Sequence, residues 1–220
     1  MHLVKGLVIA HNHFGTGHGM SIGSETYGQA DDGGEIERGV QDVLVYDLTI
    51  DADSRAIGHD ATDADFNGIR IKSDISRGGY VGNISYRDIC MRDMNNAILI
   101  NTAYNPLFTG RSFPEYGEIN FQNVRHVSCM HDTAPTVSVE GHSEVRRTGP
   151  VRFDNVIIDN IGPPGVVAEY ADIEVGPGPV NFQPVGRDVD LVDNSEGSVE
   201  PHECVFPTLP APKLPKGWLR

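Results

Sequence analysis

The sequence lacks an excess of positive charge. Its 220 residues include 17 Lys and Arg against 31 Asp and Glu, which gives a formal net charge of −14 at pH 7. Proteins that bind DNA or RNA normally present a basic face to the phosphates, so we expect no nucleic-acid partner. The same acidic balance repels a polyanionic ligand at long range. Any binding of an anionic molecule must therefore depend on a few local basic groups.

A long apolar run is also missing. The longest one near the start covers residues 7–10 and is followed by the polar residues His11 and Asn12. A membrane-spanning helix needs roughly 20 apolar residues. A signal peptide needs an apolar region followed by a cleavage site with small residues, and this start has neither. We therefore expect no membrane partner, and no signal peptide in this chain.

Cysteine is scarce, and proline is concentrated at one end. Cys90, Cys129 and Cys204 leave one cysteine over in any pairing, so their count does not settle the redox compartment. We expect Cys90 and Cys129 to be small core hydrophobes. The proline-rich end can form neither a helix nor a central strand. We predict one domain over residues 1–200 and an extended tail over residues 201–220 that straps across it, with a free linker as the alternative.

A helical period of 3.6 residues is absent, and a repeat takes its place. Five segments open with alternating apolar residues and carry Asn, Asp or His at their fifth position: residues 7–14, 43–50, 84–91, 119–126 and 151–158. Their starts fall roughly 32–41 residues apart, a period typical of solenoids. A second, shorter alternating strand follows four of them: residues 19–24, 68–73, 97–101 and 136–140.

The repeat favours stacking. One such unit cannot bury its apolar face alone, but units laid on one another form a continuous core. We therefore predict an all-β fold, a parallel β-helix (solenoid). A β-sandwich or a propeller is the less favoured all-β alternative, because two-residue hairpin signals are scarce and the same two strands recur in the same order.

The second strands carry the candidate chemistry. Alignment of the first two pairs Ser21 with Arg70 and Gly23 with Lys72, and His18 lies just before its strand, over Asn67. Side chains alternate along a strand, so Arg70 and Lys72 point outward together beside two small residues. This predicts a shallow floor with two fixed positive charges, which suits a carboxylated sugar because Arg binds carboxylates bidentately and Lys adds a point charge. An ordinary solvated strand face is the alternative.

These motifs resemble a known family. Gly-His-Gly-Met-Ser-Ile-Gly-Ser at residues 17–24, followed by Arg-Ile-Lys at residues 70–72, resembles the paired motifs of glycoside hydrolase family 28, the polygalacturonases. The wider text is similar to the bacterial exo-poly-galacturonosidase branch: residues 17–26, 67–73, 77–79 and 89–91. The resemblance covers most of the chain. It implies a right-handed parallel β-helix, hydrolysis of α-1,4-galacturonosyl bonds in polygalacturonate or pectin oligosaccharides, and no cofactor.

The resemblance also implies roles for single residues. His18 matches the active-site histidine of the family, which tunes or positions the catalytic acids. The implied substrate-binding residues are a carboxylate-binding pair, a tyrosine of the cleft and two residues beside it: Arg70, Lys72, Tyr104, Ser24 and Glu25. Intact members of the family are secreted or periplasmic.

One part of the family's machinery is not found in this sequence. The family hydrolyses with inversion, using aspartates of an Asn-Thr-Asp and an Asp-Asp motif upstream of the Gly-His-Gly motif, and inversion needs both an acid and a base. Here the sixteen residues before Gly17 contain no aspartate. We therefore expect an N-terminally truncated, C-terminal portion that is inactive alone and can self-associate through an uncapped N-terminal end. A non-catalytic galacturonate-binding β-helix is the alternative, and a polysaccharide lyase is a third.

Other acidic or metal-binding groups are weaker candidates. Asp31 and Asp32 lie in a segment that resembles an insertion between strands, and the acidic cluster at residues 60–65 fits no standard calcium loop. His11 and His13 could bind a metal ion, but no third ligand is evident. We therefore predict no metal site.

Overall fold

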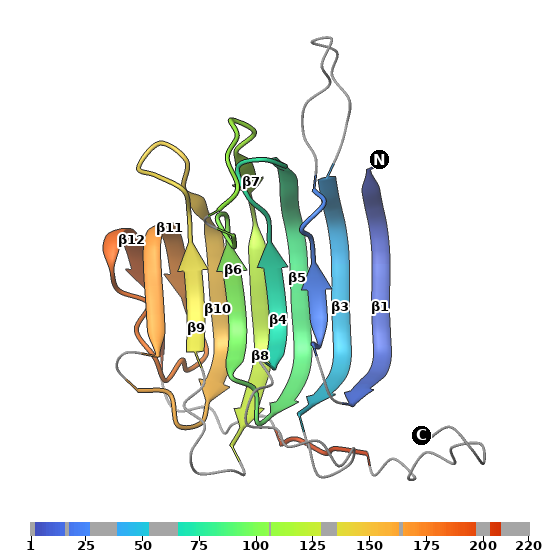
Figure 1. Cartoon of the computed structure of the whole chain (residues 1–220). Coiled ribbons are helices and arrows are strands. Elements are labelled where there is room, and N and C mark those ends of the chain that lie inside the picture. The colour runs from blue at the N-terminus through green and yellow to red at the C-terminus, as the bar shows by residue number, and fades with distance from the viewer. Residues whose placement is uncertain are drawn as a thin grey trace, which may run out of the picture.

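The computed structural model of the chain describes residues 3–15, 18–26, 39–52, 66–105, 107–128, 136–162, 165–196 and 203–207. All regular elements in these ranges are strands, as predicted, and they stack side by side from β1 to β12 (Figure 1). The strands are β1 (Val4–Gly15), β2 (Met20–Ile22), β3 (Gly39–Asp51), β4 (Asn67–Lys72), β5 (Gly79–Arg92), β6 (Asn96–Asn101), β7 (Pro114–Tyr116), β8 (Ile119–Val127), β9 (Thr136–Glu140), β10 (Thr148–Ile158), β11 (Val166–Val175) and β12 (Arg187–Asp193).

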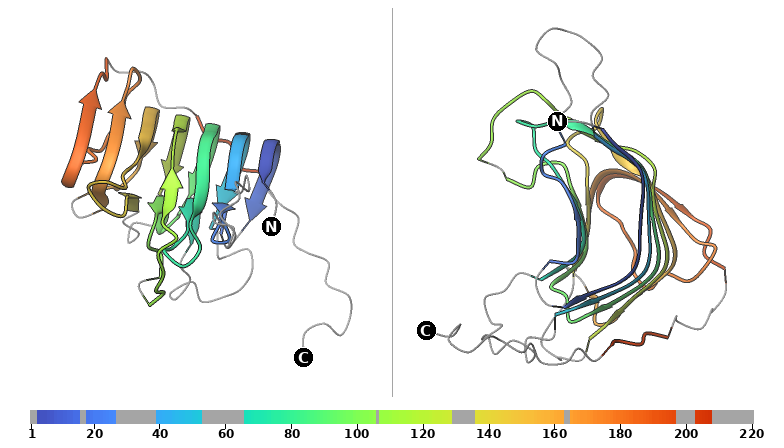
Figure 2. Two further views of the ribbon diagram at one scale, coloured as in Figure 1. Left: turned by 90° about the horizontal axis from the view of Figure 1, so that it is seen from above. Right: turned by 90° about the vertical axis from the view of Figure 1, so that its right-hand side faces the viewer.

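The strands form a right-handed parallel β-helix, which confirms the predicted fold class. Neighbours follow the order β1-β3-β5-β8-β10-β11-β9-β6-β4-β2, so the long strands build one wall and the short strands build the other. The view along the axis in Figure 2 shows the two walls facing each other, with each coil nested on the next. The apolar side chains between the walls make one continuous core.

The register of the long wall matches the sequence repeat. Leu7 pairs with Val43, Val43 with Ile84, Ile84 with Ile119, and Ile119 with Val151, which are the first residues of the five predicted segments. Inside this wall the aromatic rings stack: the centroids of Tyr86 and Phe121, and of Phe121 and Phe153, are each 5.2 Å apart. Equivalent residues of successive coils are therefore direct neighbours in the core.

The polar residue at the fifth position of each segment bends the long strand. His11, Asp47, Asp88, Asn123 and Asn155 all have a positive φ, between 52° and 55°. Asn and Asp tolerate this left-handed conformation better than most residues, which explains the pattern in the sequence. Their side chains also join the coils, since Asn155 Nδ2 donates to Asn123 Oδ1 and Asn123 Nδ2 to Asp88 Oδ1, each at 2.9 Å. His11 is the last residue of this row. Its Nδ1 lies 2.6 Å from Oδ2 of Asp47, and the pair is exposed at the surface.

Three strands were not predicted from the sequence: β7, β11 and β12. β11 combines two strands that are separate in the other coils, because it pairs with β9 through residues 166–169 and with β10 through residues 171–175. A single residue between them, Tyr170 with φ 48°, turns the chain where the other coils have a loop. The repeat was hidden here because its turn signals are missing.

The prediction for Cys90 was wrong. Cys90 is buried on β5, but it forms a disulfide with Cys204, with an S–S distance of 2.06 Å and a Cα–Cα distance of 5.6 Å. The guanidinium of Arg92 lies 4.5 Å from the ring centroid of Phe206. Residues 203–207 are therefore fixed against β5. A pair separated by 114 residues cannot be deduced from cysteine spacing. Cys129 lies outside the described residues, and the limits of the tail stay a prediction.

The two strands at the N-terminal end of the stack are edge strands of the described sheet. These are β1 in the long wall and β2 in the short wall. β1 exposes apolar side chains, with Val4 43%, Leu7 41% and Val8 59% exposed. An exposed edge with apolar residues favours pairing with another chain, so self-association through this end stays a prediction. In the described part of the chain, no helix has the length and apolar character needed to cross a membrane.

His126 is a titratable group inside the core. It is fully buried on β8, and its Nε2 accepts a hydrogen bond of 3.0 Å from the backbone N–H of Met94. Burial lowers the pKa of His126 to about 4, although the nearby carboxylates of Asp93 and Asp159 act in the opposite direction. The imidazole is therefore neutral in the folded chain at neutral pH.

This burial predicts a pH dependence of stability. Histidine titrates at about pH 6.5 in an unfolded chain. Between that pH and the lowered pKa of His126, the unfolded chain binds more protons than the folded chain, so the free energy of unfolding falls with falling pH by up to ~1.4 kcal/mol per pH unit. His126→Gln keeps an acceptor for Met94 but does not titrate, and should flatten the dependence. Urea unfolding of both proteins at several pH values between about 7 and 4.5 measures it; identical slopes would contradict the assignment.

Candidate functional site

The candidate site lies on the outward face of the short wall, at its N-terminal end. Ser21 pairs with Arg70 and Met20 with Ile69, the register that the alignment of the two motifs predicted. Ile69 and Ile71 are fully buried, so Arg70 and Lys72 take the alternate, outward positions. The predicted geometry of this strand pair is confirmed.

Arg70 and Lys72 are not neutralised by carboxylates in the described part of the chain. No ion pair there involves either residue, and the buried Nε of Arg70 has no hydrogen-bond partner among the described residues. A buried N–H group without a partner costs free energy until a ligand accepts from it. Lys72 Nζ lies 5.0 Å from the ring centroid of Tyr104, within the range of a cation–π contact. The floor therefore presents positive charge next to an aromatic ring.

Gly23 makes the close packing above Lys72 possible. It has a φ of 98°, and a Cβ at this position would lie 1.9 Å from the backbone oxygen of Lys72. Only glycine fits such a backbone conformation and such a contact. The chain after β2 can thus pass directly over β4, beside the predicted cationic floor.

Arg77 links the segments around Tyr104, and the sequence reasoning did not single it out as a site residue. It donates to the hydroxyl groups of Ser24 and Tyr104, the latter at 3.3 Å, and forms an ion pair of 3.0 Å with Glu25. Partial burial would lower the pKa of Arg77, but Tyr104, Glu25 and Asp74 raise it overall. Its guanidinium therefore stays charged and holds Tyr104 in place.

Ser24 and Glu25, which the family resemblance proposed as sugar-binding residues, both belong to this cluster. Ser24 is only 7% exposed and lies within hydrogen-bonding distance of Tyr104, at 3.4 Å. Glu25 is exposed, and its carboxylate faces Arg77. The structure brings Ser24 next to Tyr104 and Glu25 next to Arg77, and a direct contact with sugar stays a prediction for each.

The charge of the short wall changes sign along the stack. In the column that begins with Lys72, the next residues are Asn101 on β6, Glu140 on β9 and Glu169 on β11. Asn101 Nδ2 donates to Glu140 Oε1 at 3.3 Å, and Arg187 pairs with Glu169. The positive end of the wall is therefore the end next to β2 and His18, and the carboxylates lie further toward the C-terminus.

His18 stands at the outer edge of the positive end. Its Nδ1 is 2.9 Å from Nδ2 of Asn67, which is fully buried at the start of β4, as the alignment of the two strands predicted. Asn67 occupies the position of His18 one coil later, so the predicted stacking of these two residues is confirmed. The role of Asn67 was missed, because an asparagine at the start of a strand carries no chemical signal alone.

Several other candidates lie outside the described residues: Gly17, Asp31, Asp32 and the acidic cluster at residues 60–65. Among the described residues, no group of three or more His, Cys, Asp or Glu side chains could hold a metal ion. His13 lies against Thr49, with Nδ1 to Oγ1 at 2.6 Å.

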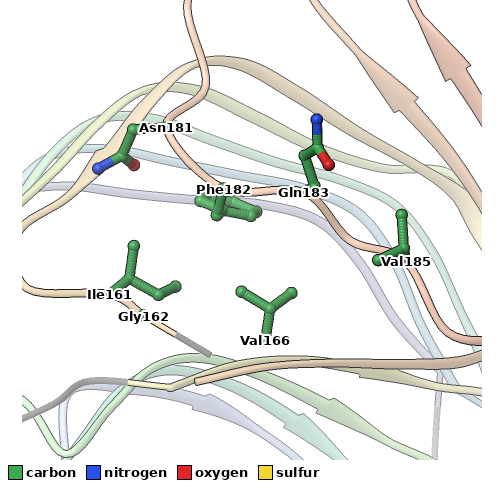
Figure 3. A pocket seen from close by; sticks show the side chains of 7 residues that line it. All are labelled: Ile161, Gly162, Val166, Asn181, Phe182, Gln183 and Val185. Atoms are coloured by element: carbon green, nitrogen blue, oxygen red, sulfur yellow. The ribbon is translucent and has the colours of Figure 1, made fainter. Parts of the chain in front are cut away.

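One cavity among the described residues lies away from this site. A pocket of about 350 Å³ lies near the C-terminal end of the stack, between the start of β11 and the segment before β12. Its lining is mostly apolar, with Ile161, Val166 and Phe182 around the hollow in Figure 3. It contains no charged side chain, so it does not suit a carboxylated ligand.

The fold and this site define a class: a solenoid of stacked parallel coils that presents basic side chains beside an aromatic ring on its outer face. Comparison with known proteins agrees. The model of the glycosyl hydrolases family 28 matches residues 4–176, and the chain belongs to this family. It is thus related to enzymes that hydrolyse glycosidic bonds.

The similar proteins all carry polygalacturonase names. The chain is 37% identical over 161 residues to a polygalacturonase of Ralstonia nicotianae, covering 72% of the chain and 27% of that protein. A polygalacturonase of Ralstonia solanacearum is 35% identical with the same coverage. An endo-polygalacturonase of Pectobacterium parmentieri is 37% identical over 120 residues, 54% of the chain and 24% of that protein. The chain thus spans about a quarter of the length of these relatives. No solved structure matches it significantly.

The packing at Gly23 predicts a sharp effect of one methyl group. Gly23→Ala should lower the free energy of unfolding by about 2 kcal/mol or more, because the Cβ meets the Lys72 carbonyl and φ is unsuitable for alanine. Gly162→Ala is a matched control, since a Cβ there meets nothing within 4 Å. Urea unfolding of both variants measures the difference; equal stabilities would contradict the close contact.

Proposed function

We propose that this chain forms the carboxylate-binding part of an enzyme that hydrolyses α-1,4-galacturonosyl bonds in polygalacturonate or pectin oligosaccharides. The supporting observation is the outward pair of Arg70 and Lys72, because the buried Nε of Arg70 has no partner in the described part of the chain. A sugar carboxylate would accept from Arg70 and lie beside the ammonium group of Lys72. The names of the relatives point to the same substrate.

The change of charge along the short wall supports a position for the sugar. A galacturonate over β2 and β4 would meet Arg70 and Lys72, whereas one over β9 would meet Glu140. The sugar carboxylate and the Glu140 carboxylate would repel each other, so the anionic ring binds at the N-terminal end of the wall. A chain with a net charge of −14 depends on this local patch for its grip on a polyanion.

Tyr104 has a separate part in this proposal. The sugar ring packs against the tyrosine, whose hydroxyl is held by Arg77 at 3.3 Å. Because Lys72 lies over the same aromatic ring, the carboxylate site and the apolar platform keep a fixed relative position. Ser24 and Glu25 support this arrangement through Arg77.

Catalysis needs a pair of groups that the described residues do not supply at the site. Inverting hydrolysis uses one carboxylic acid to protonate the leaving oxygen and one carboxylate to activate water. We place these groups on coils that stack on β2, next to His18, as the family resemblance implies. His18 then positions or tunes them, and the chain alone binds substrate without cleaving it.

A non-catalytic galacturonate-binding β-helix is the second candidate. It is favoured by the ion pair of Glu25 with Arg77, because this ion pair already occupies an exposed carboxylate near Tyr104. Both candidates share the carboxylate site and differ only in turnover. Whether cleavage in the enzyme is of the exo type, as the motifs suggest, stays a prediction.

We also propose that the protein is secreted or periplasmic. Disulfides persist in oxidising compartments and are rare in the cytosol. The bond between Cys90 and Cys204 therefore supports export, in line with a substrate that lies outside the cell.

The carboxylate site predicts a charge-specific loss of affinity. Arg70→Gln should weaken the binding of trigalacturonate to the full chain by roughly 10- to 100-fold, because a hydrogen bond to a charged group contributes about 1.5–3 kcal/mol. Lys72→Met should also weaken it. Arg87→Gln is the control, since Arg87 is exposed on β5 in the other wall and its loss changes the net charge equally. Isothermal titration calorimetry at low salt measures the affinities; equal losses for Arg70 and Arg87, or no binding by the unchanged chain, would contradict the proposal.

A further inference from the structure

A ladder of polar side chains runs across three strands of the short wall, β9, β6 and β4, and ends on His18, just before β2. Thr136 Oγ1 lies 2.5 Å from Asn96 Oδ1, Asn96 Nδ2 lies 3.0 Å from Asn67 Oδ1, and Asn67 Nδ2 lies 2.9 Å from His18 Nδ1. The four residues occupy equivalent positions on successive coils, since Asn67 pairs with Asn96 and Asn96 with Thr136. The ladder therefore follows from the in-register stacking.

The hydrogen bonds of this ladder all have the same direction. The contact of 2.5 Å between Thr136 and Asn96 fits an O–H···O hydrogen bond and is too short for an N–H···O bond, so the oxygen of Asn96 faces Thr136. The nitrogen of Asn96 then donates to Asn67, which turns the nitrogen of Asn67 toward His18. An amide nitrogen can only donate. His18 Nδ1 must therefore accept.

This direction determines where the proton of the neutral imidazole is. A neutral histidine carries one proton, on Nδ1 or on Nε2, and the hydrogen bond at one nitrogen selects the other. Since Nδ1 of His18 accepts, its proton is on Nε2. Asn67 is 0% exposed, so its side-chain amide is shielded from bulk water.

We propose that Asn67 is a positioning residue that holds His18 as the Nε2–H tautomer. Asn96 and Thr136 set the orientation of the side-chain amide of Asn67. If the proposed function is correct, His18 then offers an N–H donor, and not a base, to the carboxylates that react with the sugar. The inference on the tautomer itself rests only on the ladder.

The tautomer can be read directly by NMR. A long-range ¹H–¹⁵N correlation spectrum of the full chain, labelled with ¹⁵N-histidine, distinguishes protonated from unprotonated ring nitrogens, and His18→Gln identifies the signals of His18 by their loss. At about pH 8, where an ordinary histidine is neutral, we expect Nδ1 unprotonated and Nε2 protonated. A protonated Nδ1 in the unchanged chain would overturn the proposal.

Two substitutions test the direction of the ladder. Asn67→Asp replaces the donating nitrogen with an oxygen that can only accept, so Nδ1 of His18 should become protonated. Thr136→Val removes the hydroxyl at the far end, which should shift the ratio of tautomers by roughly fivefold toward Nδ1–H, the effect of one hydrogen bond. A purely structural role for either residue would leave the tautomer unchanged, and that result would overturn the proposal.

Thr102→Val is the matched control. Thr102 is a buried threonine directly after β6, whereas Thr136 is partly buried; the hydroxyl of Thr102 donates to the backbone oxygen of Glu140 at 3.2 Å and lies outside the ladder. Its loss should leave His18 as Nε2–H. If Asn67→Asp does not fold, the His18 tautomer in the unchanged chain and in Thr136→Val still tests the proposal. An equal shift in the tautomer ratio in Thr102→Val and Thr136→Val would overturn it. Because no sugar is present, failure of the hydrolase proposal would not affect the outcome.

Discussion

The structure depends on the parallel stacking of coils in register, one strand spacing of about 4.8 Å apart. Once Leu7 lies on Val43 and Val43 on Ile84, every other position of the repeat is aligned as well. The interior becomes a set of columns, such as the stacked rings of Tyr86, Phe121 and Phe153. No single coil could bury these side chains alone.

The same constraint builds the candidate site. On the outward face of the short wall, columns of polar residues replace the columns of the core. One column leads from Lys72 to Glu140 and changes from positive to negative, which gives the wall a direction for an anionic chain. Another leads from Thr136 to His18 and carries hydrogen bonds of one direction. A site made of columns can be altered in chemistry one residue at a time, while the stack stays intact.

Sequence reasoning succeeded where the repeat is regular. It predicted the five long segments, their register, and the outward position of Arg70 and Lys72, because alternation and period are local properties. It missed β11, where Tyr170 replaces a loop, and the disulfide to Cys204, whose partners are 114 residues apart. Tyr104 was named as a site residue, but Arg77, which joins it to Ser24 and Glu25 from loops of different coils, was missed. Contacts between loops leave no periodic trace in a sequence.

The most direct test of the account is hydrolysis by a chimera. The part of the Ralstonia nicotianae polygalacturonase that precedes its matched 161 residues would be joined to the N-terminus of this chain. Release of reducing ends from polygalacturonate, and absorbance in the ultraviolet, are then measured for the chimera and for the chain alone. The account predicts reducing ends from the chimera only, without an ultraviolet rise. Cleavage by the chain alone, a rise in the ultraviolet, or a folded but inactive chimera would contradict it.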